Sequence, residues 1–360
     1  MRREQCWGRM MVVLLFSFIL VGIAVTGDTV EAAEGQKFTV GLSNGPFTHS
    51  WRVQMAESLR EEFEFYKEKG WVDKLIIQNA GPDVNTQIAQ IRNLIVSGVD
   101  LLLINPNSLT ALNPVIEEAK DAGILVVVYD QPVDNPDVIN VFMNQEWWMA
   151  PITEWLCKQL NGKGNIVYIS GIADQTGSIL RDQSAEKVLA QYPDIKLLAK
   201  ANGNWDQAAA QQVMTDILGS FPQIDGVLTQ DGMTLGVIRA FQAAGRPLPI
   251  VTGETQVAFI KMWKELKDSQ GFNTFGVTNS PGAVCTSLGI GLRLLQGKEL
   301  KPENLIDNHI IYLRPALFVD NNNIDQIYEE YKDWADSYYV NKWYTQEQSQ
   351  TSGRTGGLKW

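Results

Sequence analysis

The sequence predicts an α/β protein with two doubly wound parallel-sheet domains. From Lys37 onward, short apolar segments alternate with amphipathic stretches, which is the pattern of parallel strands joined by right-handed helical crossovers. The stretches Gly98-Val99-Asp100 and Ile224-Asp225-Gly226 each introduce a strand in the same way, and Gly123 and Gly245 each end the preceding helix, so two similar halves are expected. The expected strands lie near 38–43, 74–78, 100–104, 124–128, 139–142, 164–169, 195–199, 225–229, 249–252, 274–278 and 310–313.

One complete strand–helix–strand unit stands in the sequence GVDLLLINPNSLTALNPVIEEAKDAGILVVVYDQP. Its apolar runs at 101–104 and 125–128 are unbroken, as expected for strands that are covered on both faces. Thr110 is expected to cap the intervening helix and Gly123 to end it. The unit therefore fixes two neighbouring strands of the first sheet.

Polar residues follow both of these strands. Asn105 and Asp130 stand at the carboxyl ends, where ligands bind in open parallel sheets. Asn and Asp also commonly begin turns. Taken alone, the two positions therefore fit a ligand site and a pair of turns equally well.

The N-terminal segment has the layout of a secretory signal peptide. Arg2, Arg3 and Arg9 precede an apolar run at 11–25, and small residues follow it up to Ala32. The run is shorter than the roughly 20 residues that a membrane helix needs. We expect residues 1–32 to be removed near Ala32 and the protein to be periplasmic, with an uncleaved anchor as the alternative. Near the C-terminus, a helix rich in acidic and aromatic residues is expected from Asn323 to about Trp343. Residues 344–360, rich in Gln, Ser, Thr and Gly, are expected to form a flexible tail.

Composition narrows the possible partners. The chain carries a formal charge of −11, and the expected signal peptide holds equal numbers of Arg and acidic residues, so the mature chain keeps that charge. This argues against nucleic acid and anionic membranes. Only Cys157 and Cys285 lie beyond the signal peptide, both in predicted helices, so the fold is not built on disulfides and two free thiols are expected. About 330 mature residues suggest two domains.

The motifs of common catalytic sites are missing. The two histidines, His49 and His309, belong to no spaced metal-ligand cluster or triad. The Gly162-Lys163-Gly164 turn precedes a strand, whereas a dinucleotide-binding loop follows one. We therefore predict no metal, no cofactor and no enzymatic activity.

Three carboxylates nevertheless follow apolar strands, namely Asp130, Asp231 and Glu254. They could act as an acid/base pair in glycoside hydrolysis, or they could accept hydrogen bonds from ligand hydroxyls. Sequence separation alone does not decide between these two chemistries.

Several stretches, in order, resemble one family. They are VGLSNGPFTHSWR at 40–52, LLLINP at 101–106, VVVYDQP at 126–132, TGSILRDQ at 176–183, VLTQDGMTLGVIRA at 227–240, VTGET at 251–255 and TNSPG at 278–282. Over its whole mature length the chain resembles the type I periplasmic solute-binding proteins of the ribose and galactose class, which are soluble receptors of ABC sugar importers.

The resemblance implies two domains joined by three chain crossings, near 142–144, 278–281 and 307–310, with the ligand held between them. The implied N-terminal domain comprises 37–142 plus 280–308. The C-terminal domain comprises 143–279 plus 309–343.

The resemblance also implies a set of ligand contacts. Phe47 and Trp205 are the expected stacking aromatics, since the C–H faces of a sugar ring lie well on aromatic rings. Ionised and amide side chains satisfy the hydroxyls. The SNxxxxxSWR arrangement resembles a subgroup that takes varied sugars, and Gln131 and Gly45 stand where the ribose type has Arg and Asn. The expected ligand-binding residues are Asn44, Phe47, Trp51, Arg52, Asn105, Asp130, Gln131, Asn144, Arg181, Trp205, Asp231, Glu254 and Asn279.

The function expected from the sequence is therefore that of the sugar-binding component of an ABC importer. The protein is expected to act as a monomer, to close by a hinge motion around a monosaccharide and to present it to a permease. A sensor for a sugar or a furanone-like signal, which feeds a chemoreceptor or a kinase, is the alternative. A secreted carbohydrate hydrolase is the third possibility.

Overall fold

The computed structural model describes residues 35–45 and 50–343, which belong to one compact unit. The expected signal peptide, Phe47 and the expected tail lie outside these residues. Within the described ranges, no helix has the length and apolar character needed to cross a membrane.

The first sheet has six strands, and all its neighbouring strands pair in parallel, as predicted. In spatial order they are β11 (Ile310–Leu313), β5 (Ile139–Met143), β4 (Leu125–Tyr129), β3 (Leu101–Asn105), β1 (Phe38–Asn44) and β2 (Val72–Asn79). Leu103 pairs with Val127 in the centre, and both side chains are fully buried. The unbroken apolar runs thus reflect burial on both faces of the sheet.

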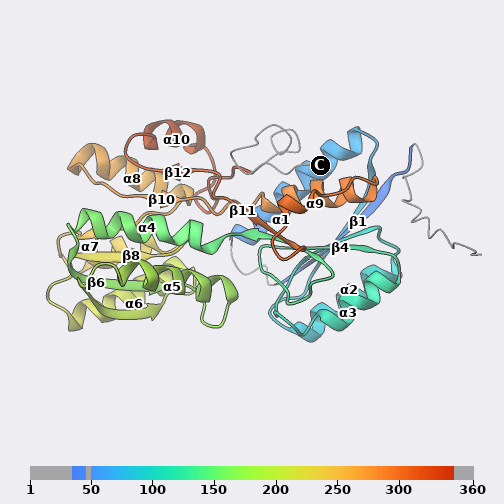
Figure 1. Ribbon diagram of the computed structural model, residues 1–360. Coiled ribbons are helices and arrows are strands. Elements are labelled where there is room, and N and C mark those ends of the chain that lie inside the picture. Colours follow the sequence, from blue (N-terminus) through green and yellow to red (C-terminus); the bar gives the residue numbers. More distant parts are fainter. Residues whose placement is uncertain (1–34, 46–49, 344–360) are drawn as a thin grey trace, which may run out of the picture. The chain divides into compact units, whose positions relative to one another are not determined.

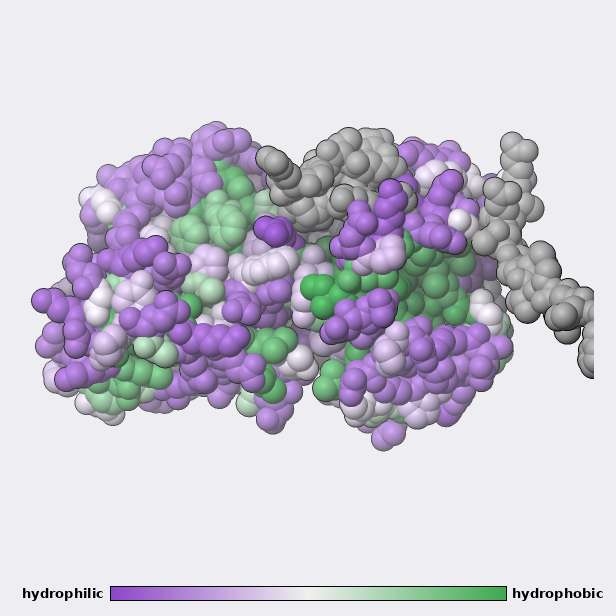
Figure 2. Space-filling model, in the orientation of Figure 1, coloured by the Kyte–Doolittle hydropathy of each residue, from purple (hydrophilic) through white to green (hydrophobic). Residues whose placement is uncertain are grey.

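Helices cover both faces of this sheet (Figure 1). On one face, α1 (Ser50–Glu68) and α9 (Ala283–Leu295) pack through Met55, Leu59 and Leu288. On the other, α2 (Val84–Val96) and α3 (Asn113–Asp121) pack through residues such as Leu94 and Ile116. Figure 2 shows that hydrophilic residues dominate the visible surface and that hydrophobic ones gather around α9.

The second sheet has four parallel strands. In spatial order they are β7 (Asp194–Asn202), β6 (Lys163–Ser170), β8 (Gly226–Thr229) and β9 (Ile250–Val251). One face packs against α4 (Gln145–Gln159) and α5 (Thr176–Leu189), and the other against α6 (Gln207–Ser220) and α7 (Thr234–Ala243). The two doubly wound parallel sheets predicted from the sequence are therefore present.

The remaining elements lie outside the six-stranded and four-stranded sheets. The short strands β10 (Gly276–Val277) and β12 (Phe318–Val319) pair antiparallel, and a 3₁₀ turn spans Pro302–Asn304. Helices α8 (Val257–Gln270) and α10 (Ile324–Tyr331) form a separate apolar cluster.

Three local predictions were wrong. The last helix, expected over 323–343, ends at Tyr331, because the chain beyond it makes long-range backbone bonds instead, including Val340 N–H to the Thr255 carbonyl at 2.8 Å. Helix α3 begins after Leu112 with no side-chain cap, so Thr110 does not cap it. The strand Ile310–Leu313 was assigned to the C-terminal domain, but it pairs with β5 in the first sheet.

Candidate functional site

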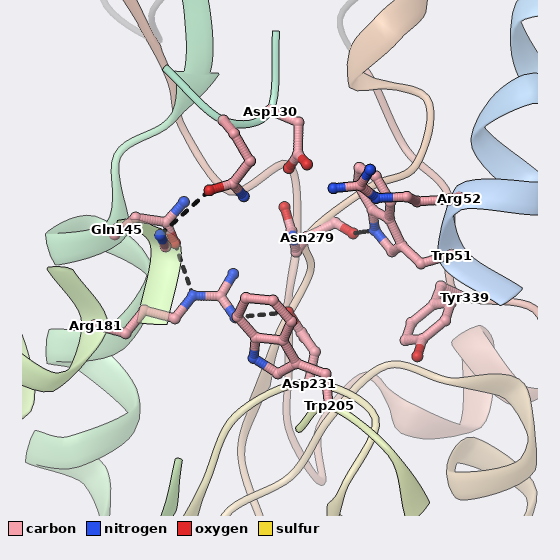
Figure 3. A pocket seen from close by; sticks show the side chains of 11 residues that line it. Trp51, Arg52, Asp130, Gln145, Arg181, Trp205, Asp231, Asn279 and Tyr339 are labelled. Carbon is pink, nitrogen blue, oxygen red and sulfur yellow. Dashed lines mark hydrogen bonds and ion pairs between the residues drawn. The ribbon is translucent and has the colours of Figure 1, made fainter. Parts of the chain in front are cut away.

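A cavity lies between the carboxyl ends of the strands of the two sheets. Its empty space is about 540 Å³, a volume that includes open solvent at the mouth of the cavity. Figure 3 shows charged side chains entering the cavity from opposite sides, with aromatic rings between them.

Asp130 enters the cavity from the first sheet, directly after β4. Its backbone has a φ of 66°, a left-handed conformation that Asp and Asn tolerate better than most residues. Its Oδ2 accepts a 3.1 Å hydrogen bond from the Asn105 amide at the end of the neighbouring strand β3. The predicted pair of strand-end residues is therefore in contact, and the Asn105 amide holds the Asp130 carboxylate in place.

Arg181 and Asp231 form a buried ion pair on the opposite wall, with a distance of 3.0 Å from Nη1 to Oδ2. Arg181 comes from α5, and its Nε also donates to Gln145 Oε1 at 2.7 Å. Its guanidinium lies 3.8 Å from the ring centroid of Trp148, a geometry that favours a cation–π contact. The guanidinium is thus held by three neighbours before any ligand arrives.

Aromatic rings line the space between these charges. Trp51 donates from Nε1 to the Asn279 carbonyl at 2.7 Å, and Trp205 donates to Gln230 Oε1 at 2.8 Å. Tyr339 completes this part of the wall (Figure 3). Since both indole N–H groups already have partners, the rings can offer their faces to a ligand.

Two further predicted residues complete the wall. Arg52 reaches the cavity from α1, and its Nη1 is buried without a hydrogen-bond partner among the described residues. Gln131 accepts a 3.3 Å hydrogen bond from the Gly177 N–H, which joins the loop after β4 to the start of α5. Eight of the predicted residues therefore line one cavity: Trp51, Arg52, Asp130, Gln131, Arg181, Trp205, Asp231 and Asn279.

Four predicted residues do not line the cavity. Asn44 and Asn105 are fully buried at the ends of β1 and β3, behind the wall. Asn144 caps α4, and its Oδ1 accepts from two backbone N–H groups at 3.0 Å. Glu254 is fully buried and accepts from the Leu235 N–H at the start of α7. Phe47 lies outside the described residues.

Three lining residues were not predicted from the sequence: Gln145, Gly177 and Tyr339. Gln145 directly follows the predicted Asn144, and Gly177 opens the helix that carries Arg181, so an adjacent signal existed for both. Tyr339 carried no such signal, because it fell within the segment expected to be helical.

Burial sets the protonation behaviour of the site. It raises the pKa of Asp130, while the nearby Arg52 guanidinium and the Asn105 amide act in the opposite direction. Burial likewise raises the pKa of Asp231, against the effect of Arg181. The pKa of Glu254 is raised to about 8 by burial and by repulsion from Asp231. At neutral pH, Glu254 is therefore mainly a neutral acid that holds the α7 N-terminus.

The arrangement suits binding through hydrogen bonds and stacking. Within the described ranges, no group of three or more His, Cys, Asp or Glu residues could hold a metal ion. Cys157 and Cys285 are free and buried, in agreement with the prediction.

Residues 40–299 match the family model described as a periplasmic binding protein domain. The chain belongs to this family. Among curated members, it is 33% identical over 256 residues to the xylitol-binding protein of Mycolicibacterium smegmatis, a match that covers 70% of each chain. It is 30% identical over 226 residues to the D-ribose/D-allose-binding protein of Pseudomonas aeruginosa, covering 60% of this chain and 69% of that one.

Solved structures of periplasmic binding proteins share the fold. The ABC transporter solute binding protein of Thermobispora bispora has a TM-score of 0.76 and 30% identity, and the match covers 86% of this chain and 93% of that one. The resemblance read from the sequence motifs is thereby confirmed.

Proposed function

We propose that this protein is the soluble sugar-binding component of an ABC importer, and that it takes a monosaccharide or a related small polyol into the cavity. The observation that carries the proposal is the lining itself: Asp130 from one sheet faces the Arg181–Asp231 pair from the other, with the Trp205 ring beside them. Hydroxyl groups both donate and accept hydrogen bonds, so they fit a wall that offers carboxylates and guanidinium groups together. The names of the two curated relatives, one for xylitol and one for D-ribose and D-allose, support this ligand class.

The proposal includes export, a permease partner and closure. A mature protein released near Ala32 acts as a monomer in the periplasm, closes around its ligand and delivers it to the permease. Its two domains have the boundaries expected from the sequence, with the third crossing moved beyond Leu313 because Ile310–Leu313 pairs with β5. Ligand contacts that require both domains at once favour the closed form.

We propose that the protein binds its ligand and does not convert it to a product. A glycosidase needs two carboxyl groups that flank the scissile bond, one as general acid. Of the three candidate carboxylates, Glu254 does not line the cavity and Asp231 is paired with Arg181. That leaves Asp130 without a second, free carboxylate in the cavity.

Native mass spectrometry of freshly purified protein, together with a thermal-shift panel of D-ribose, D-allose, xylitol and myo-inositol, tests this function. We expect a retained or added mass of one polyol, a raised melting temperature and recovery of the ligand unchanged after incubation. Small-angle scattering should show a smaller radius of gyration with saturating ligand. Steady product formation, or the absence of binding to every polyol, would contradict the proposal.

A further inference from the structure

Gly45 directly follows β1, and its missing side chain leaves space that other residues use. A Cβ atom at this position would lie 2.4 Å from Arg52 Nη1 and 2.2 Å from Asn107 Oδ1. Both distances are far shorter than real contacts of a Cβ atom. The φ of Gly45 lies outside the left-handed region, so the obstacle to a side chain here is the neighbouring atoms.

The two neighbours differ in how firmly they are held. Asn107 is fixed at both its backbone and its side chain, because its N–H donates to Gln87 Oε1 at 2.9 Å and its Nδ2 donates to the Gly81 carbonyl at 2.8 Å. Arg52 Nη1 is buried with no hydrogen-bond partner among the described residues. A side chain at position 45 would press on both groups, and the Arg52 guanidinium, which has no hydrogen bond at Nη1, would move more readily than the Asn107 amide.

The position of Arg52 matters for the cavity. Its side chain lines the wall near Asp130, and the residue is only 7% exposed. A guanidinium group offers only donors and a carboxylate offers only acceptors. A guanidinium and a carboxylate that lie side by side match neighbouring hydroxyl groups of a ligand, because each hydroxyl can accept a hydrogen bond from the guanidinium and donate one to the carboxylate.

We propose that Gly45 determines specificity in this cavity: by lacking a side chain it admits the Arg52 guanidinium beside Asp130, which selects ligands that carry adjacent hydroxyls. The ligand class in this inference rests on the proposed function, but the placement of Arg52 by Gly45 does not depend on that function. Gly45 acts through Arg52 and is a positioning residue.

The first test needs no ligand. In ¹³C-labelled, ligand-free protein, NMR titration of the Asp130 carboxyl group should show a higher pKa in Gly45→Ala than in the unmodified protein. Arg52→Met should give the same upward shift, because each change removes a cation that lowers the Asp130 pKa. An unchanged Asp130 titration in Gly45→Ala would overturn the placement.

Two controls separate this effect from general disturbance. Gly219→Ala, in α6, adds a methyl group with no atom within 4 Å and should leave the Asp130 pKa unchanged. Asn107→Ala removes the other neighbour, so Gly45→Ala should still shift the Asp130 pKa in that background. Loss of the shift there would show that Gly45 acts through Asn107 and would contradict the proposal.

The second test is a double-mutant cycle on affinity, measured by calorimetric titration with whichever of D-ribose, D-allose, xylitol and myo-inositol gives the largest thermal shift. Arg52→Met and Gly45→Ala should each weaken binding by about 10- to 150-fold, the range for one hydrogen bond to a charged group. The double variant should bind no more weakly than Arg52→Met alone. Additive losses of affinity would show that Gly45 does not act through Arg52 and would overturn the proposal. If none of the four compounds binds, the proposed function is contradicted, and the NMR titration alone decides whether Gly45 places Arg52.

Discussion

Asp130 and Asp231 face the same cavity from two different sheets, but their surroundings differ. Asp231 has the Arg181 guanidinium bonded to it at 3.0 Å, and Arg181 is itself held by Gln145 and Trp148. Asp130 accepts a hydrogen bond from the neutral amide of Asn105, and the Gln131 side chain also favours its charged form, but no cation within the described ranges is bonded to it. The Asp231 charge is therefore neutralised by a bonded cation before binding, although its Oδ1 has no hydrogen-bond partner among the described residues, whereas the Asp130 charge has no bonded cation among them. This difference predicts that removing a charge at Arg181 acts mainly on folding and that removing one at Asp130 acts mainly on binding.

The largest effect is expected at Asp130. Asp130→Asn keeps the shape and the left-handed backbone but replaces an acceptor with a donor. If the carboxylate accepts two ligand hydroxyls at about 1.5 to 3 kcal/mol each, affinity should fall by about 100- to 10,000-fold. Calorimetric titration measures the loss, and a thermal melt should show no loss of stability.

Asp100→Asn is the matched control for this change. Asp100 lies at the opposite end of β3 and accepts a 2.7 Å hydrogen bond from the Thr39 N–H. That variant should lose stability and keep its affinity. Unchanged affinity in Asp130→Asn would show that Asp130 does not bind the ligand. Asp130 and Asp231 would then differ only in how they are packed.

Breaking the other wall should act mainly on folding. Arg181→Met leaves the Asp231 carboxylate buried without its cation, which typically costs about 3–5 kcal/mol of unfolding free energy. The cost should shrink as the pH falls, because protonated Asp231 no longer needs the cation. Denaturant unfolding at several pH values measures this.

A paired variant checks the cause. Arg181→Met combined with Asp231→Leu removes both charges and should recover most of the lost stability, while binding stays impaired. If Arg181→Met alone unfolds no more easily than the unmodified protein, the Arg181–Asp231 pair does not stabilise the fold.

Glu254 gives a pH-dependent effect. Its folded pKa of about 8 lies above its ordinary value, so the folded state holds a proton that the unfolded state releases. Stability from this group is fully present below the ordinary glutamate pKa and is lost as the pH rises through about 8. Relative to Glu254→Gln, the unmodified protein should therefore lose up to about 1.4 kcal/mol per pH unit across this window. Parallel pH curves for the two proteins in denaturant unfolding would contradict this.

The smallest effect is expected at Trp205. Trp205→Ala should weaken binding by about 2- to 10-fold, from an aromatic contribution of about 0.5–1.5 kcal/mol, and should reduce the ligand-induced change in intrinsic fluorescence. Trp334→Phe alters a side chain on α10's C-terminal side that is 41% exposed, so it should keep both affinity and signal change. A full signal and full affinity in Trp205→Ala would place its ring away from the ligand.

The sequence predicted the parts of this molecule that depend on local pattern. The runs that became β3 and β4 are apolar on both faces because both faces are buried, and Asn105 and Asp130 had to meet because parallel strands end at the same edge. Arg181 was placed through its motif, and the helix that carries it follows β6 as expected.

The remaining parts depend on distant contacts. Tyr339 lies in the cavity because Gln54 of α1 bonds to its backbone N–H and carbonyl, an interaction across 285 residues that no local pattern announces. Glu254 was expected at the ligand, but its carboxyl group accepts from the Leu235 N–H at the α7 N-terminus. Whether the Glu254 side chain points into the cavity or toward the end of α7 depends on its orientation. The spacing of residues along the sequence does not specify that orientation.

The left-handed backbone at Asp130 also limits how this receptor can diverge. A position with φ near 66° is inexpensive for Asp, Asn and Gly and costly for branched or bulky residues. Descendants that acquire new ligands are therefore free to vary Arg52 or Gln131 far more widely than position 130. Among paralogues with different ligands, we expect this site to alternate among three residue types while its neighbours diversify.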